Sequence, residues 1–363
     1  TEPYEEEIGN FSMVQPGGTV TFDILQTSLV FHQKYFNIGL YRQPVAWGAS
    51  GTNNLILSKS APLFSYIGFD TKFKGIKLSM IHGSLLNDST HYRNIAFQQR
   101  NRSKYIAAHR LDIPFFRGTT TVGFSEMVIY GDREIDIAYM TPFGFYWPIG
   151  HALEDRDNTL MAMDVKTTFI RNITFYGSVL IDEMRFSELG KQWWANKHAW
   201  QAGMRWSPNI ATLPFDFQAE FTAVRPWTYS HKTLTTNYTH NSICLGFPYG
   251  ANSQTWYFKI GTALSRRLTL TSEYLILKKG VDDSTHFWGG DATVSYELRD
   301  EQYDHATKWL MGDIETTNQL KVAGRYEIFN DFFIKAGINL YNTKLNNDQE
   351  SYRFGFIETE INF

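Results

Sequence analysis

Apolar and polar residues alternate along most of this chain with a period of two. In residues 332–340, FFIKAGINL, Phe332 and Ile334 fall on one face of an extended strand and Lys335 falls on the other. The same alternation recurs, about ten residues at a time, in 215–223, 255–264 and 319–329. Segments of this length and period are typical of strands that cross a membrane in a closed barrel. The pattern predicts an all-β fold: a transmembrane antiparallel up-and-down β-barrel, one domain over 1–363.

The predicted connections alternate between short and long. The short ones are Gln33-Lys34, Lys74-Gly75, Arg117-Gly118, Arg171-Asn172, Arg266-Arg267 and Asn330-Asp331. The long ones are rich in Trp, Tyr, Asn and Asp and cover 44–62, 87–103, 131–156, 185–196, 227–254 and 280–313. Outer-membrane barrels have short periplasmic turns and long extracellular loops, whereas a soluble sandwich has no reason for this alternation. We therefore expect the outer membrane of a Gram-negative cell.

The expected number of strands is about 16, within a range of 14–18. Counting back from the last strand, 354–363, gives fifteen strands to residues 19–32, and residues 4–14 supply a sixteenth. A further hairpin formed by 134–140 and 143–147 would raise the number to eighteen.

Composition adds an excess of aromatic residues and little net charge. Phe, Tyr and Trp make up 16% of the chain and cluster near the predicted strand ends, where amphipathic rings suit the membrane–water interface. Phe363 ends the last strand on its lipid-facing side and resembles the C-terminal signal for outer-membrane assembly. The net charge of −3 gives no indication of a nucleic-acid partner. The expected surroundings are outer-membrane lipid and lipopolysaccharide.

Candidate catalytic and metal-binding groups are weak. The HGS at 82–84, with His109 and Ser125, is the kind of pairing found in lipid hydrolases, but no GxSxG elbow accompanies it. The loop HALEDRDN at 151–158 offers oxygen ligands without the spacing or glycine of an EF-hand. We therefore expect no enzyme activity, no cofactor and no metal site.

Charged residues of both signs recur on the predicted inward faces. These lumen-lining candidates are Arg110, Asp112, Asp164, Lys166, Asp182, Glu220, Lys259, Lys321, Arg325, Glu327 and Lys335. Cross-strand ion pairs that stiffen the wall are one interpretation, and a lumen that filters solutes by charge is the other. The mixed signs favour the structural interpretation.

Aromatic rings in the long loops are candidates for stacking on sugar faces. The predicted ligand-binding residues are Trp47, Tyr146, Trp147, Trp193 and Trp194. The alternative for each ring is a place in the interfacial girdle or in loop packing.

Several stretches resemble a known family. RQPVAWGASGTNNLILSKSAP, Arg42 to Pro62, is similar to the tryptophan- and glycine-rich segment of capsule-assembly Wzi-like outer-membrane proteins. KYIAAHRLDI, VGFSEMVIYG, the stretch from YMTPFGFYWP to EDRDN, and WWANKHAWQAG also resemble that family. The resemblance implies a barrel that associates with capsular or other surface polysaccharide at the cell surface, as a lectin does.

Three hypotheses for the function follow. The first is the polysaccharide-associating barrel that the resemblance implies. The second is a porin-like channel for small solutes, because sixteen strands leave room for a lumen unless loops fill it. The third is a structural or docking subunit that binds other outer-membrane proteins. The 44–62 and 131–156 loops are the ones expected to fold over the mouth or into the lumen.

Overall fold

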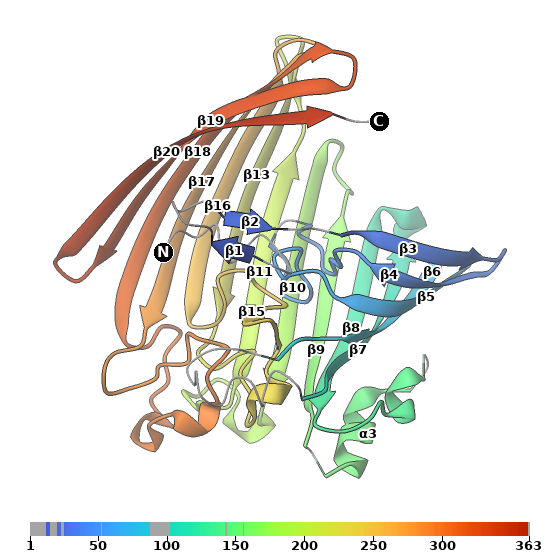
Figure 1. Ribbon diagram of the computed structural model, residues 1–363, viewed down its shortest axis with the longest axis vertical. Coiled ribbons are helices and arrows are strands. Elements are labelled where there is room, and N and C mark those ends of the chain that lie inside the picture. Colours follow the sequence, from blue (N-terminus) through green and yellow to red (C-terminus); the bar gives the residue numbers. More distant parts are fainter. Residues whose placement is uncertain are drawn as a thin grey trace.

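The computed structural model describes residues 12–14, 20–22, 25–51, 53–87, 102–141, 144–154 and 156–361. Most of this chain forms one 16-stranded antiparallel sheet that curves into a barrel wall (Figure 1). Fifteen strands follow one another from β20 back to β3, and the two-residue β12 pairs only with β13. This arrangement confirms the predicted up-and-down β-barrel topology.

The strands of the wall are longer toward the C-terminus. Their bounds are β3 Thr27–His32, β4 Phe36–Arg42, β5 Ser65–Phe73, β6 Ile76–Ser84, β7 Lys104–Phe115, β8 Thr120–Gly131, β9 Asn158–Thr167, β10 Ile173–Glu183, β11 Lys197–Trp206, β12 Asn209–Ile210, β13 Leu213–Val224, β16 Ser253–Ala263, β17 Leu268–Val281, β18 Asp313–Phe329, β19 Phe332–Leu345 and β20 Asp348–Ile361. Two small hairpins lie outside this sheet and consist of β1 Ser12–Val14 with β2 Val20–Phe22, and β14 Thr239–His240 with β15 Ile243–Cys244.

Two details of the predicted strand order are wrong. The segment 4–14 does not supply the sixteenth wall strand, because its described part, β1, pairs with β2 in a separate hairpin. The described residues of 134–140 and 143–147 do not form a hairpin: Ile137–Met140 is the 3-10 helix η2, and residues 146 and 147 begin the helix α3 (Tyr146–Ala152). Phe363 lies outside the described residues.

Helical structure is confined to the connections. Besides η2 and α3, the described residues contain the 3-10 helices η1 Phe116–Gly118, η3 Phe186–Glu188, η4 Leu234–Thr236, η5 Tyr296–Leu298 and η6 Glu301–Tyr303. None of the helices in the described part of the chain has the length and apolar character needed to cross a membrane.

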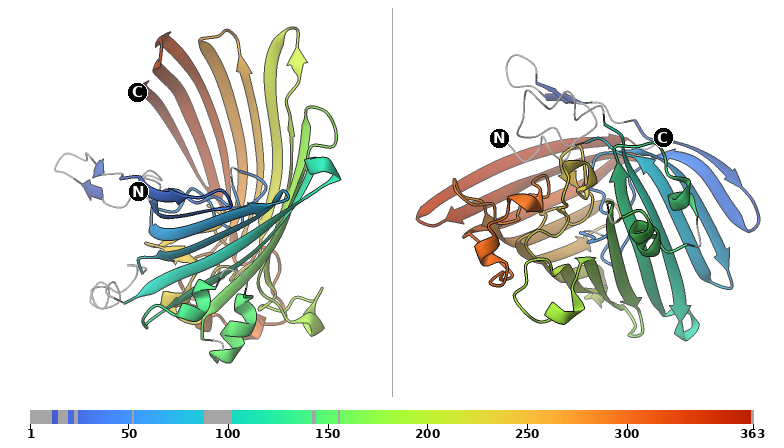
Figure 2. Two further views of the ribbon diagram at one scale, coloured as in Figure 1. Left: turned by 90° about the vertical axis from the view of Figure 1, so that its right-hand side faces the viewer. Right: turned by 90° about the horizontal axis from the view of Figure 1, so that it is seen from below.

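The predicted short and long connections separate to opposite ends of the wall, with one exception that was not predicted: residues 346 and 347 join β19 to β20 in a two-residue turn at the long-loop end. The long connections gather at the lower end in Figure 1 and face the viewer on the right of Figure 2. At the other end, Lys74 and Gly75 join β5 to β6 in two residues, both with positive φ. A two-residue turn of this kind matches the right-handed twist of the strands it joins. The long-loop end is the extracellular end by the architecture of outer-membrane barrels.

The two faces of the wall have different chemistry. One face carries exposed apolar side chains and is the lipid-facing side; examples are Phe124, Met163, Trp200, Trp256, Phe258, Ile260 and Ile357. The opposite face carries the charged residues and is covered by loops over β6–β13. Strands β3 and β20 are the two edges of the sheet, and no ladder joins them among the described residues (Figure 2).

Candidate functional site

The segment 47–58 enters the lumen and contacts the inner face of the wall. Ser50 Oγ donates a 2.5 Å hydrogen bond to Glu220 Oε2, and Arg205 donates to the Ser50 carbonyl oxygen. The Gln201 amide donates to the carbonyl oxygen of Asn53. We call the described residues of 47–58 the plug, because polar groups from strands β11 and β13 hold them against the inner face of the wall.

Apolar burial fixes the second half of the plug. Leu55 and Ile56 are fully buried and Leu57 is 1% exposed. They belong to one core cluster with small and aliphatic wall residues, among them Ile106, Ala108, Met127, Ile129, Leu180, Ala199 and Val224. Burial of three aliphatic side chains contributes about 1.5–3 kcal/mol for each one. The lumen at this level is therefore a packed core, and the expectation that the 44–62 loop folds inward is fulfilled.

A second loop, 225–252, packs on the plug from the extracellular side. The hydroxyl groups of Tyr229 and Tyr238 each donate a 2.8 Å hydrogen bond, to the carbonyl oxygens of Leu55 and Ile56 respectively. Ser58 N donates to Leu245 O at 2.9 Å. Full burial raises the pKa of both tyrosines well above the ordinary value, so the hydroxyl groups stay protonated and remain donors.

Buried charged residues at the rim tie loop 225–252 to the wall. Asp182 Oδ2 accepts the backbone N–H of Tyr229 at 2.7 Å, and Lys197 Nζ donates to Ser230 O at 3.1 Å. Lys104 Nζ donates to Thr239 Oγ1 at 2.8 Å. Lys104 and Lys197 were not among the predicted site residues, although each is the first residue of an inward-facing alternation that follows a long loop.

Two side chains reach across an intervening strand at a glycine. Tyr176 on β10 passes over Gly203 on β11 and donates a 2.7 Å hydrogen bond to Glu220 on β13. A Cβ on Gly203 would lie 2.3 Å from the Tyr176 ring, so the tyrosine needs glycine at this place. The same carboxylate oxygen accepts Ser50 of the plug.

Arg110 on β7 uses the same device. Its guanidinium lies over Gly123 of β8, where a Cβ would come within 2.2 Å, and it forms two hydrogen bonds with Asp164 on β9, of 2.5 and 2.9 Å. Arg110 also contacts Asp112 at 2.7 Å. The pair is 8% and 4% exposed and is an internal brace of the wall.

The lumen face of the C-terminal strands carries ion pairs of a more exposed kind. Arg325 pairs with Glu360 at 3.1 Å, Lys335 with Glu358 at 2.7 Å, and Lys259 with Glu273 at 3.5 Å. These side chains are 33–54% exposed. Lys335–Glu358 and Lys259–Glu273 join neighbouring strands, and Arg325 reaches across β19 to Glu360 on β20, which is the structural use of mixed charge.

The strand register places every predicted lumen-lining residue on the face opposite the apolar band. Asp182, Glu220, Arg110 and Asp164 are buried there beneath or beside the loops. Lys166, Lys321 and Glu327 lie on the same face in cross-strand pairs with Tyr176, Glu273 and Phe333. Arg110, Asp112, Asp164, Asp182, Lys259, Arg325 and Lys335 form ion pairs with residues of opposite sign, which agrees with wall bracing.

The predicted ring residues lie in three different environments. Trp47 is partly buried against the core and pairs with Leu57 inside the plug. Tyr146 is fully buried and Trp194 is 7% exposed, which differs from the expectation of surface rings. Trp147 is 52% exposed, and Trp193 is half-buried and packs against Trp194.

The 131–156 loop lies outside the barrel, which corrects the expectation that it folds over the mouth. Tyr130 and Val128 point to the outer face, opposite to the plug-facing Ile129. Tyr139 and Tyr146 pack on them, and Glu126 accepts the N–H groups of Tyr146 and Trp147 at 2.7 Å. Two outward apolar positions at the end of β8 therefore draw η2 and α3 onto the outer wall.

A cluster of half-buried rings lies in the 282–312 connection, one of the predicted long loops. Trp288 stacks on His286, with ring centroids 5.1 Å apart, and meets Tyr303 edge-on at 5.0 Å. Asp283 accepts the Trp288 indole N–H at 3.0 Å, and its bonds from Thr285, first among them the hydroxyl, hold its pKa below the usual range. We call Asp283, His286, Trp288, Asp300 and Tyr303 the aromatic loop site. Rings beside carboxylates are a surface suited to sugar faces and hydroxyl groups.

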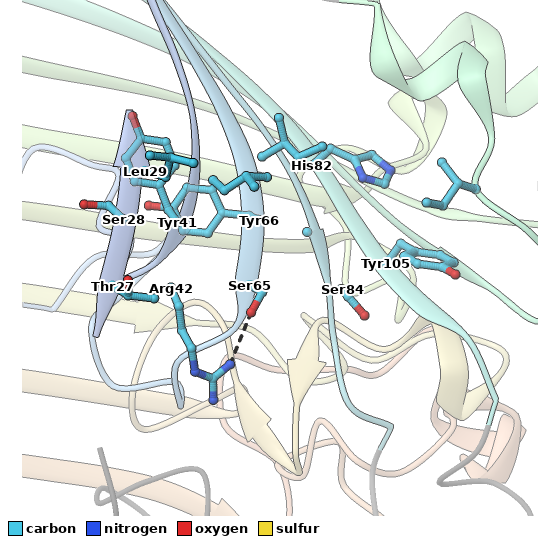
Figure 3. Close-up of a pocket in the computed structure, with 14 residues that line it drawn as sticks. Thr27, Ser28, Leu29, Tyr41, Arg42, Ser65, Tyr66, His82, Ser84 and Tyr105 are labelled. Atoms are coloured by element: carbon cyan, nitrogen blue, oxygen red, sulfur yellow. Dashed lines mark hydrogen bonds between the residues drawn. The ribbon is translucent and has the colours of Figure 1, made fainter. Parts of the chain in front are cut away.

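A shallow outward pocket of about 450 Å³ lies on β3–β7 (Figure 3). Leu29, Leu40 and Ile67 line it with apolar surface, and Arg42 donates a weak 3.4 Å hydrogen bond to Ser65 at its edge. His82, with its ring bonded to the Tyr130 hydroxyl at 2.6 Å, closes one side. His82 of the HGS motif and Tyr130 therefore serve in packing. Among the described residues of this pocket, no nucleophile lies beside a positioned base.

Comparison with known proteins gives several solved structures with a similar fold. Wzi of Escherichia coli, an outer-membrane protein involved in group 1 capsule assembly and described as a carbohydrate-binding β-barrel, has a TM-score of 0.66 at 12% identity, covering 96% of this chain and 72% of that one. OccK10 (OpdN) of Pseudomonas aeruginosa gives 0.47 at 9% identity over 93% and 92% of the chains, and a BenF-like porin of Pseudomonas fluorescens gives 0.47 at 10% over 93% and 77%. The curated protein sequences contain no match.

The sequence itself matches the capsule assembly protein Wzi family over residues 12–352. That range includes the plug, both glycine-crossed braces and the long loops. The shared outer-membrane barrel fold and the outward apolar band place the protein in the outer membrane. The chain belongs to the capsule assembly protein Wzi family.

Proposed function

We propose that this protein associates with surface or capsular polysaccharide through its extracellular loops, without catalysing a reaction. The observation that carries the proposal is the plug: Leu55 and Ile56 are fully buried against the inner face of β6–β13, so this part of the interior is occupied by the chain itself. A solute path through this part of the barrel would require that core to open, whereas the extracellular loop surface can be reached by polysaccharide without any rearrangement. The carbohydrate-binding description of E. coli Wzi supports the same role here.

The proposed contact surface is the aromatic loop site with the exposed predicted ring of Trp147 and the half-buried ring of Trp193. Trp288 and Tyr303 offer ring faces, and Asp283 and Asp300 offer acceptors for hydroxyl groups. Trp47, Tyr146 and Trp194 contribute as buried supports of the surrounding loops. In this proposal the chain acts as a single unit, because the plug, near the N-terminus, binds wall strands far along the sequence.

Retention of polysaccharide from the host surface on the immobilised, detergent-solubilised protein tests this proposal. Trp288→Ala is expected to weaken retention about fivefold, since a lost ring contact is worth about 1 kcal/mol. The matched control is Trp256→Ala, a ring 49% exposed on the lipid-facing wall, which is expected to retain polysaccharide normally. Equal retention by all three proteins, or none by the unaltered one, would refute the proposal. Stable conductance steps in a planar bilayer would favour a channel instead.

A further inference from the structure

The outer side of the wall carries a basic pocket at the extracellular rim. It has a volume of about 800 Å³ and lies between the β10–β11 connection, the ends of β11 and β13, and residues 307–310. Its lining includes Lys191, His198, Trp200, Arg225, Lys308 and Trp309. We call these residues the rim pocket.

Arg225 is the unusual member of the rim pocket. Arg225 is only 6% exposed, and its Nη2 donates hydrogen bonds to the carbonyl oxygens of Trp193 and Thr307, both at 3.2 Å. Its buried Nε has no hydrogen-bond partner, and no carboxylate pairs with the guanidinium among the residues that the structure describes. A buried cation without a counter-ion is costly. An anion entering the pocket would remove that cost.

The strand register shows that this pocket opens to the lipid side. Lys197 and Ala199 of β11 face the lumen. Because side chains alternate along a strand, His198 and Trp200 face outward. Val224 is in the lumen-side core, so Arg225 follows on the outward side. Trp200 is 50% exposed and continues into the apolar band with Trp256. Lys278, outward on β17, pairs across the strands with Gln254 of the pocket.

We infer that the rim pocket binds the phosphorylated sugar headgroup of a glycolipid from the outer leaflet. The guanidinium of Arg225 offers a planar fork for phosphate oxygens, and Lys191 and Lys308, which also line the pocket, add positive charge. Trp200 and Trp309 also line the pocket, with Trp309 5.1 Å from His198 and 5.8 Å from the Arg225 guanidinium, and such rings suit the membrane interface. The pocket's position on the lipid side favours a membrane glycolipid over a soluble polysaccharide.

Quenching of tryptophan emission during titration with diphosphoryl lipid A in mixed detergent micelles tests the inference. The unaltered protein is expected to bind this lipid at least tenfold more tightly than its dephosphorylated form, and high salt is expected to weaken binding. Arg225→Gln is expected to lose about tenfold in affinity, as removal of about 1.4 kcal/mol predicts. The affinity of Arg225→Lys for diphosphoryl lipid A is expected to lie between those of the unaltered protein and Arg225→Gln.

Lys191→Gln with Lys308→Gln is the second variant, because both side chains are on the surface and their loss leaves the fold intact; a loss of affinity is expected there too. Trp288→Ala is the control and is expected to bind the lipid normally. Equal affinity for the dephosphorylated lipid overturns the inference. So does equal competition by inorganic phosphate or by an acidic polysaccharide at the same charge concentration. Polysaccharide retention by Arg225→Gln is expected to be unchanged, so this inference and the proposed function fail separately.

Discussion

The wall beneath the plug and the wall of strands β18–β20 use charge in opposite ways. Under the plug, Glu220 is 2% exposed and its carboxylate accepts hydrogen bonds from Ser50 and Tyr176. On β18–β20, Arg325 and Lys335 pair with Glu360 and Glu358 while remaining about one third exposed. Both groups follow from the same alternating sequence pattern. What differs is whether a loop covers them.

Burial under a loop changes how much each charged residue contributes to the free energy of unfolding. A charge removed from water must be matched by hydrogen bonds, and breaking such a group leaves its partner buried and uncompensated. A pair in contact with water is screened and contributes little. In the covered wall, charged residues therefore hold specific loop segments in place. In the uncovered wall, several exposed ion pairs each contribute a small amount to stability.

The largest effect is expected from Asp164→Ala. The change leaves Arg110, 8% exposed, without its two-bond partner and should lower the free energy of unfolding by about 3–5 kcal/mol. Denaturant titration of the protein refolded in detergent measures it. Asp112→Ala removes the half-buried partner of the same arginine and should cost clearly less. Equal costs for the two variants would contradict the distinction between covered and uncovered charge.

A smaller effect on stability, with a visible functional consequence, is expected from Glu220→Ala. The variant loses the acceptor for both Ser50 and Tyr176, about 2 kcal/mol in all, and loosens the polar end of the plug. Planar-bilayer recordings are expected to show conductance steps that the unaltered protein lacks. Glu220→Gln keeps an acceptor oxygen and should stay closed. If the alanine variant is as silent and as stable as the parent, the plug does not depend on this attachment.

The smallest effect is expected from Lys335→Ala on the uncovered wall. Its partner Glu358 is 54% exposed, so the loss in the free energy of unfolding should be below about 1 kcal/mol. Raising the salt concentration should shrink the difference between variant and parent further. The same denaturant titration checks both expectations. A loss as large as that of Asp164→Ala would remove the contrast between the two regions.

The sequence allowed the turns, the strand faces and the order of the wall to be predicted because each depends on neighbouring residues. Gly75 suits the positive φ that the turn after β5 requires, and the alternation in 332–340 places Lys335 on the lumen side. The 134–140 segment is not a strand because Tyr139 packs on Val128 and Tyr130 of β8. The chain reaches that position by reversing its direction in the loop after β8. No local period reports that choice.

The candidate sites were less predictable than the wall. Trp288 and Tyr303 meet through a fold of the 282–312 connection, and Arg225 and Lys308 meet across two different loops. Gly203 and Gly123 look like weak points of a strand until Tyr176 and Arg110 are seen lying over them. Such contacts join residues from separate strands, so their spacing along the chain carries no signal.

The sequence by itself determined that this protein is an antiparallel outer-membrane barrel with short turns at one end and long loops at the other. A period of two and a sequence of turn residues are local properties, and they specify which face of each strand meets lipid. Only the tertiary structure decided which residues of the 44–62 loop are buried against the inner wall, Leu55 and Ile56 among them, and that the described residues of 144–154 cover the outer wall. The physical reason is burial: each loop goes where Leu55, or Tyr146, leaves water most completely.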